Sequence, residues 1–69
     1  MNEFIWEVRG CEDFKYEGEL HTHEVPDDVA DYFGLYTMGP DGLMQWYWDF
    51  PTREEAAEAG RALELDFNK

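Results

Sequence analysis

The fold is decided by residues 35–56, LYTMGPDGLMQWYWDFPTREEA. Two β-rich runs, 35–38 and 43–50, flank a turn at 39–42 that has proline in its second position and glycine in its fourth. Proline fixes the φ angle that this position of a turn requires, and glycine accepts conformations that other residues avoid. Strict alternation along 43–50 adds the period of a strand. We therefore predict a β-hairpin here.

The same stretch ends with the signals of a helix start. Thr52 and Glu55 form the T-x-x-E pattern of a capping box. Glu54 and Glu55 also suit the positive end of a helix dipole. Small and apolar residues then recur on one stripe, which predicts a helix packed closely on an aromatic sheet. The stripe consists of Ala56, Gly60, Leu63 and Phe67.

The N-terminal half repeats the strand-strand-helix outline. Residues 3–9 and 14–21 alternate as strands do, and the Gly-Cys-Glu-Asp run at 10–13 is typical of a turn between them. Residues 25–34 predict a short helix, with Pro26 in its first turn and Gly34 as its stop. Because two turns are short for a helix, a 3₁₀ or irregular segment is the alternative.

These elements predict an α+β fold in one domain, residues 1–69. The expected order is ββαββα, a four-stranded antiparallel sheet with two helices packed on one face. Alternation along the fourth strand places Trp46 and Trp48 together, and we expect both in the core. Tyr47, Tyr36 or Tyr16 are then the expected exposed aromatic residues.

Composition limits what the protein can bind. The chain has 17 acidic residues against 5 basic ones, a net charge of -12, together with 12 aromatic residues. The aromatic content argues against a disordered acidic tail. The charge argues against nucleic acid and anionic membranes as direct partners, because both would repel the protein. A cationic protein surface is the expected partner, and the alternative is an acidic surface that only solvates the fold.

The candidate partner-binding residues are the acids of the second strand and the short helix, with two tyrosines as stacking anchors. Residues 12–31 hold eight acids and one base, Lys15. Neighbouring carboxylates on one strand face lie roughly 6.6 Å apart, so they can form a row of negative charge. The predicted site is Glu17, Glu19, Asp27, Asp28 and Asp31, with Tyr16 and Tyr32.

Other constellations favour structure over chemistry. The His21-x-His23 pair could hold a metal with a carboxylate, but no second ligand motif supports it. Cys11 stands beside two acids that disfavour its thiolate, so we expect a turn thiol without a role. Abundant carboxylates in a chain too short for a deep cleft do not indicate catalysis. We expect no enzyme, no metal and no cofactor.

The length, charge and aromatic content of the whole chain resemble the small acidic DNA-mimic inhibitors that phages and mobile elements encode, including anti-CRISPR and anti-restriction proteins. The resemblance implies that carboxylates replace phosphates and block a basic groove. The implied partner is a nucleic-acid-processing protein such as a CRISPR effector, a restriction enzyme or a repair enzyme. The alternative is a module that docks through an aromatic patch or a sheet edge at 3–9 or 35–38, as a monomer or a homodimer.

The expected compartment is the cytoplasm, that of the host cell if a phage encodes the protein. A single cysteine excludes an intrachain disulfide and fits a reducing environment. The first residues lack the basic and apolar regions of a signal peptide. No run of the sequence approaches the ~18 apolar residues of a membrane span.

Overall fold

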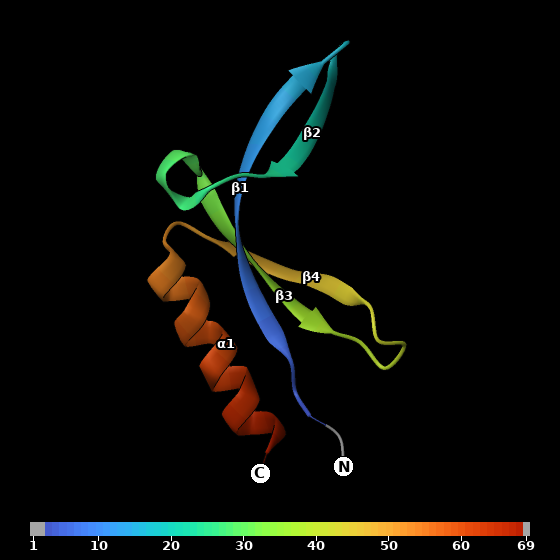
Figure 1. Ribbon diagram of the computed structural model, residues 1–69, viewed down its shortest axis with the longest axis vertical. Coiled ribbons are helices and arrows are strands. Elements are labelled where there is room, and N and C mark those ends of the chain that lie inside the picture. The colour runs from blue at the N-terminus through green and yellow to red at the C-terminus, as the bar shows by residue number, and fades with distance from the viewer. Residues whose placement is uncertain (1–2, 69) are drawn as a thin grey trace.

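The computed structural model describes residues 3–68 and shows a four-stranded antiparallel sheet with one α-helix on one of its faces (Figure 1). The strand order in the sheet is β2-β1-β3-β4. Within residues 3–68 no helix covers the other face of the sheet, and we call it the open face. The elements are β1 (Trp6–Tyr16), β2 (Glu19–Glu24), the 3₁₀ helix η1 (Asp27–Val29), β3 (Tyr32–Met38), β4 (Met44–Phe50) and α1 (Arg53–Phe67).

The long strand β1 has two halves with different partners. Residues 6–11 pair with β3, and residues 11–16 pair with β2 on the opposite edge. The distal half of β1 and the whole of β2 therefore project as a two-stranded ribbon beyond the rest of the sheet (Figure 1). We call residues 12–24 the ribbon. Its projection gives the molecule an elongated shape of 45 × 26 × 15 Å.

The predicted turn at residues 10–13 is wrong, because β1 runs through it. The ribbon instead turns at Glu17 and Gly18, which have φ angles of 53° and 83°. Two positive φ angles in a two-residue loop match the twist of a hairpin. Gly10 serves close packing. A Cβ there would lie 2.8 Å from the Val25 carbonyl oxygen and 3.1 Å from the Ala30 Cβ.

The predicted first helix at 25–34 is also wrong, so the order ββαββα is replaced by four strands and one α-helix. Within 25–34, Asp27–Val29 form one turn of 3₁₀ helix, so the 3₁₀ alternative is confirmed for these three residues. Its first-turn acids suit a helix start, but Tyr32 and Phe33, which fall within the predicted helix, begin β3. Pairing of Tyr32 with Cys11 and of Phe33 with Gly10 overrides the short local pattern.

The hairpin of β3 and β4 is confirmed. The Gly39 N–H donates to the Leu43 carbonyl oxygen at 2.9 Å, and Gly42 adopts a φ of 83°. A β-bulge interrupts the pairing near Tyr36. Residues 35–38 lie in β3, which is paired on both sides, so the prediction of an open edge there is wrong. Residues 6–9 of β1 have β3 as their only strand partner among the described residues.

The predicted C-terminal helix is confirmed as α1. The Thr52 hydroxyl accepts a hydrogen bond from the Glu55 N–H at 3.1 Å, as a capping residue should. Ala56 and Gly60 are buried against the sheet, whereas Leu63 is half-buried and Phe67 is exposed. The small residues let α1 approach Trp6, whose indole N–H donates to Glu64 at 2.9 Å.

The fully buried core is very small. Within residues 3–68 the buried apolar side chains are Cys11, Leu35 and Ala56. The expectation that Trp46 and Trp48 are core residues is wrong, since they are 55% and 59% exposed and stack on each other at 5.9 Å. Their strand β4 lies at the edge of the sheet, and Trp46 lines a pocket on the open face, which α1 does not cover. Much aromatic surface is therefore left in solvent.

Candidate partner-binding site

The predicted acidic site is divided between two places. Glu17 and Glu19 lie at the tip of the ribbon, and Asp28 and Asp31 lie in or beside η1 near its base (Figure 1). All four are exposed. The base is fixed by backbone hydrogen bonds from Val25 to Gly10 and from Asp31 to Cys11. Both groups of acids therefore belong to the ribbon half of the molecule.

Asp27, also predicted for the site, has a structural role. Its two carboxylate oxygens accept hydrogen bonds from Nε and Nη2 of Arg53 at the start of α1. This hydrogen bonding holds the pKa of the Asp27 carboxyl below its usual range. Arg53 also lies over the Phe33 ring, 5.6 Å from its centroid. Asp27 therefore ties η1 to α1 and is less available to a partner than Asp28 or Asp31.

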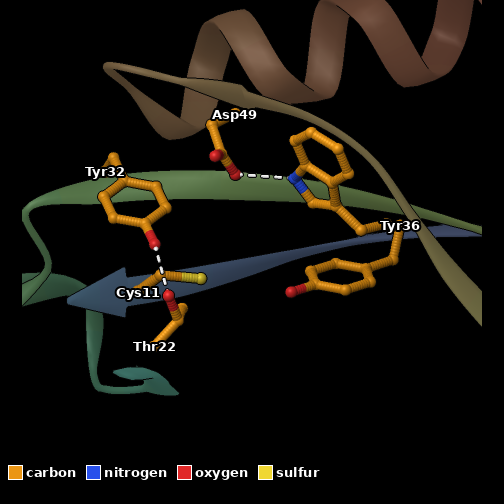
Figure 2. Close-up of a pocket in the computed structure, with 6 residues that line it drawn as sticks. Cys11, Thr22, Tyr32, Tyr36 and Asp49 are labelled. Atoms are coloured by element: carbon orange, nitrogen blue, oxygen red, sulfur yellow. Dashed lines mark hydrogen bonds between the residues drawn. The ribbon is translucent and has the colours of Figure 1, made fainter. Parts of the chain in front are cut away.

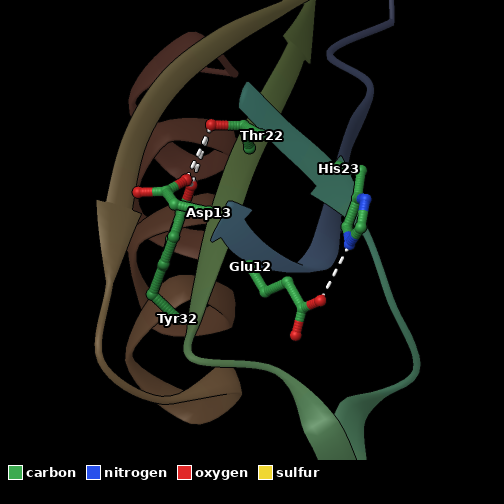
Figure 3. A network of polar contacts seen from close by, with 5 residues as sticks. All are labelled: Glu12, Asp13, Thr22, His23 and Tyr32. Carbon is green, nitrogen blue, oxygen red and sulfur yellow. Dashed lines mark hydrogen bonds and ion pairs between the residues drawn. The ribbon is translucent and has the colours of Figure 1, made fainter. Parts of the chain in front are cut away.

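The two histidines of the ribbon lie on one of its faces, together with Phe14. The Phe14 ring contacts both of them, with ring centroids 5.4 Å from His21 and 4.7 Å from His23. His23 also contacts Glu12 at 2.9 Å (Figure 3). No group of three or more metal-ligating side chains occurs among residues 3–68. The geometry gives no support for a metal held between the histidines.

The opposite ribbon face is joined to the sheet by a polar network (Figure 3). The Tyr32 hydroxyl donates to Asp13 at 2.6 Å, and the Thr22 hydroxyl donates to the same carboxylate oxygen at 2.7 Å. These bonds hold the pKa of Asp13 below its usual range. Tyr32, predicted as a stacking anchor, is therefore only partly available. Tyr16, at the ribbon tip, is 63% exposed.

We expect Tyr32 to ionise at a higher pH than a tyrosine in water does. Burial, followed by its hydrogen bond to Asp13, raises the pKa of Tyr32 to about 12. A raised folded-state pKa means that this contribution to stability is present below pH ~10 and lost as the pH rises through about 12. Tyrosinate absorbance should be followed against pH for the wild type and for Tyr32→Phe. The wild type should show one additional transition at high pH, which Tyr32→Phe lacks.

An Asp13→Asn variant provides the control for this titration. Removal of the carboxylate should bring the Tyr32 transition to lower pH without reaching the ordinary value, because burial is the larger cause. An unchanged transition in Asp13→Asn would show that the network does not control Tyr32.

The open face contains a pocket of about 240 Å³ that the sequence did not indicate (Figure 2). All four strands contribute to it, because β1 changes partners at Cys11. The Trp46 indole N–H donates to Asp49 at 2.8 Å across its rim. The lining residues are Cys11, Thr22, Tyr32, Tyr36, Trp46 and Asp49.

Cys11 forms the floor of this pocket and is not the expected turn thiol. It is only 3% exposed, and its thiol lies 3.3 Å from the Arg9 carbonyl oxygen. Burial raises the pKa of the thiol, and the negative charges of Asp49 and Glu24 raise it further. The sequence-based expectation attributed a disfavoured thiolate to the adjacent Glu12 and Asp13, whereas burial, Asp49 and Glu24 raise the pKa here.

The Tyr36 ring makes an intramolecular cation–π contact with Arg9. The Arg9 guanidinium lies over the ring at 4.3 Å from the centroid and forms an ion pair with Glu7 at 2.7 Å. Arg9 is not among the residues that line the pocket. An alternation pattern could suggest Tyr36 as an exposed aromatic residue, but the register that brings it near Trp46 and Asp49 is not encoded locally.

Comparisons with protein-family models, curated proteins and solved structures found no significant match to this chain. Among the described residues, no helix has the length and apolar character needed to cross a membrane. Function must therefore be argued from the ribbon, the open face and their charges.

Proposed function

We propose that the protein is an inhibitor that binds a basic, nucleic-acid-processing protein and occupies its nucleic-acid site with the acidic ribbon. The observation that carries this proposal is the projection of residues 12–24 beyond the helix-covered part of the sheet. A projecting ribbon can enter a groove that a compact acidic surface could not. The rest of the molecule then remains outside the groove.

The charge of the ribbon suits such a groove. Residues 12–24 contain five acids and one lysine. A strand rises about 3.3 Å per residue and its side chains alternate between faces, so carboxylates two residues apart lie roughly 6.6 Å apart on one face. Carboxylates along the two strands can therefore form a line of negative charge opposite the basic side chains of a nucleic-acid groove. Asp28 and Asp31 extend the negative charge at the base of the ribbon.

We expect binding to be strongly salt-dependent and to be reversed by nucleic acid. The test is capture of a partner from a bacterial lysate on immobilised protein, followed by elution either with salt or with duplex DNA. Raising the salt from about 0.1 M to about 1 M shortens the Debye length from ~10 Å to ~3 Å, so an electrostatic complex should dissociate. A partner whose nucleic-acid site is occupied should also be released by DNA at low salt.

Charge-neutralising variants then identify the surface. Glu17→Gln, Glu19→Gln, Asp28→Asn and Asp31→Asn together should weaken binding of the captured partner at least about tenfold. The matched control removes four exposed charges elsewhere, with Glu3→Gln, Asp41→Asn, Glu54→Gln and Glu58→Gln. If both variants weaken partner binding equally, the effect comes from net charge and not from this surface. If the first variant does not weaken binding, the ribbon is not the binding surface.

A second candidate function is docking through aromatic side chains. It is favoured by the stacked pair of Trp46 and Trp48, each more than half exposed on the edge strand β4. Aromatic residues of this kind are enriched in the energetically important parts of interfaces. Such binding should survive high salt and fail in Trp48→Ala, whereas ribbon-mediated binding should do the reverse.

A further inference from the structure

We infer that the pocket on the open face accepts an arginine side chain of the partner protein. This inference rests on the proposed function, because it assumes a basic partner. It adds a specific contact to an interface that would otherwise depend on charge alone. The pocket and the ribbon also lie on connected parts of the sheet, because Thr22 of the ribbon lines the pocket.

The walls of the pocket have the chemistry that a guanidinium group requires. Tyr32, Tyr36 and Trp46 supply aromatic rings, and Asp49 supplies a carboxylate (Figure 2). A cation is attracted to aromatic faces, and arginine also stacks its planar group on them. Arg9 already shows this contact on the Tyr36 ring, outside the pocket lining.

The carboxylate of Asp49 has an acceptor available. Its Oδ1 atom receives the Trp46 indole N–H, and within residues 3–68 its Oδ2 atom accepts no hydrogen bond. A guanidinium presents several N–H donors in a fixed fork, so it can use this oxygen while it stacks on a ring. The Asp13 carboxylate, which accepts from Tyr32 and Thr22, adds negative charge beside these two lining residues, at the other end of the pocket from Asp49.

Size and charge together favour a single cationic side chain as the occupant. The volume of about 240 Å³ is below the roughly 300–1,000 Å³ of pockets that hold drug-sized ligands, so a single side chain is the better fit. A nucleotide or another anion would be repelled by Asp49 and by the net charge of -12. The same net charge opposes a second copy of this chain as the source of the arginine.

The test uses the intact protein and two small probes that differ in charge but hardly in shape. The probes are N-acetyl-arginine amide and its neutral isostere N-acetyl-citrulline amide. Binding is followed by the NMR signals of the tryptophan indole N–H groups. We expect arginine to shift the Trp46 signal in a saturable way, with citrulline binding at least about tenfold more weakly. The Trp6 signal, bound to Glu64 on the helix side, should not move.

Two variants probe the pocket without removing its aromatic rings. Asp49→Asn keeps an acceptor for Trp46 but removes the charge. Gly34→Ala adds a Cβ that would lie 3.0 Å from the Tyr36 ring, 3.4 Å from Asp49 Oδ1 and 3.6 Å from Cys11 Sγ, at the floor of the pocket. Each should weaken arginine binding at least about tenfold, whereas Glu54→Gln should not. An unmoved Trp6 signal confirms that each variant is folded.

The outcomes separate this inference from the proposed function. Equal shifts with arginine and citrulline, or undiminished arginine binding by Asp49→Asn, would overturn the arginine pocket. A molecular mass that rises with protein concentration in the absence of arginine, together with protection of the Trp46 signal, would assign the open face to a second copy of the chain. That result would also overturn the arginine pocket. The fourfold variant Glu17→Gln, Glu19→Gln, Asp28→Asn and Asp31→Asn should bind arginine normally. A loss of partner binding in that variant therefore tests the acidic residues and not the pocket.

Discussion

Leu35→Ala should leave the protein largely unfolded at room temperature. Leu35 is the only large side chain of the described residues that is fully buried. It lies in the central strand β3, opposite Val8 of β1 and Trp48 of β4. Truncation of a buried leucine costs about 2–5 kcal/mol through lost burial and the remaining cavity. A domain of this size has a total stability of roughly 3–5 kcal/mol, so little would remain.

Circular dichroism with urea titration measures this loss directly. Leu65→Ala is the matched control, because Leu65 is 71% exposed on α1 and its truncation should change the free energy of unfolding by less than about 0.5 kcal/mol. Leu35→Met, which nearly conserves volume, should cost less than about 1.5 kcal/mol. A Leu35→Ala protein with a full cooperative transition near that of the wild type would contradict this description of the core.

The C-terminal half of the fold could be predicted because its signals are local. The turn at 39–42 and the cap at Thr52 each act within a few residues, and tertiary contacts do not oppose them. The N-terminal half could not be predicted, because β1 pairs with β3 up to Cys11 and with β2 beyond it. No local pattern indicates that these two segments form one long strand. The Gly10 that suggested a turn instead allows the close approach of the segment at 25–30.

The candidate site divides in the same way. Exposure and sign of charge follow from composition, so the acids of the ribbon could be proposed without a structure. The ion pair of Asp27 with Arg53 joins residues 26 positions apart, and no local pattern indicates it. The open-face pocket depends on the register of all four strands around Cys11. Tyr36 and Asp49 come together there only after the sheet has formed.

Gly60→Ala should destabilise the protein, although alanine is the better helix former. A Cβ at position 60 would lie 2.5 Å from Cδ2 and Cε3 of the Trp6 ring, much closer than atoms can approach. The ring would have to move, and with it the hydrogen bond from its N–H to Glu64. Overpacking costs about 1–3 kcal/mol, and the gain in helix propensity of about 1 kcal/mol offsets only part of it.

The physical cause can be tested with a double-mutant cycle between positions 60 and 6. Trp6→Phe shortens the ring system and removes the bond to Glu64, so it should itself be destabilising. Because the smaller ring leaves room for a Cβ, Gly60→Ala should cost less in the Trp6→Phe background, with a coupling of about 0.5–3 kcal/mol. In thermal unfolding, the Tm of the single Gly60→Ala variant should fall by about 4–8 °C for each kcal/mol of lost stability. Additive effects of the two substitutions would mean that α1 does not rest on Trp6, and an α1 free to move would leave the sheet without the cover that makes one of its faces a core.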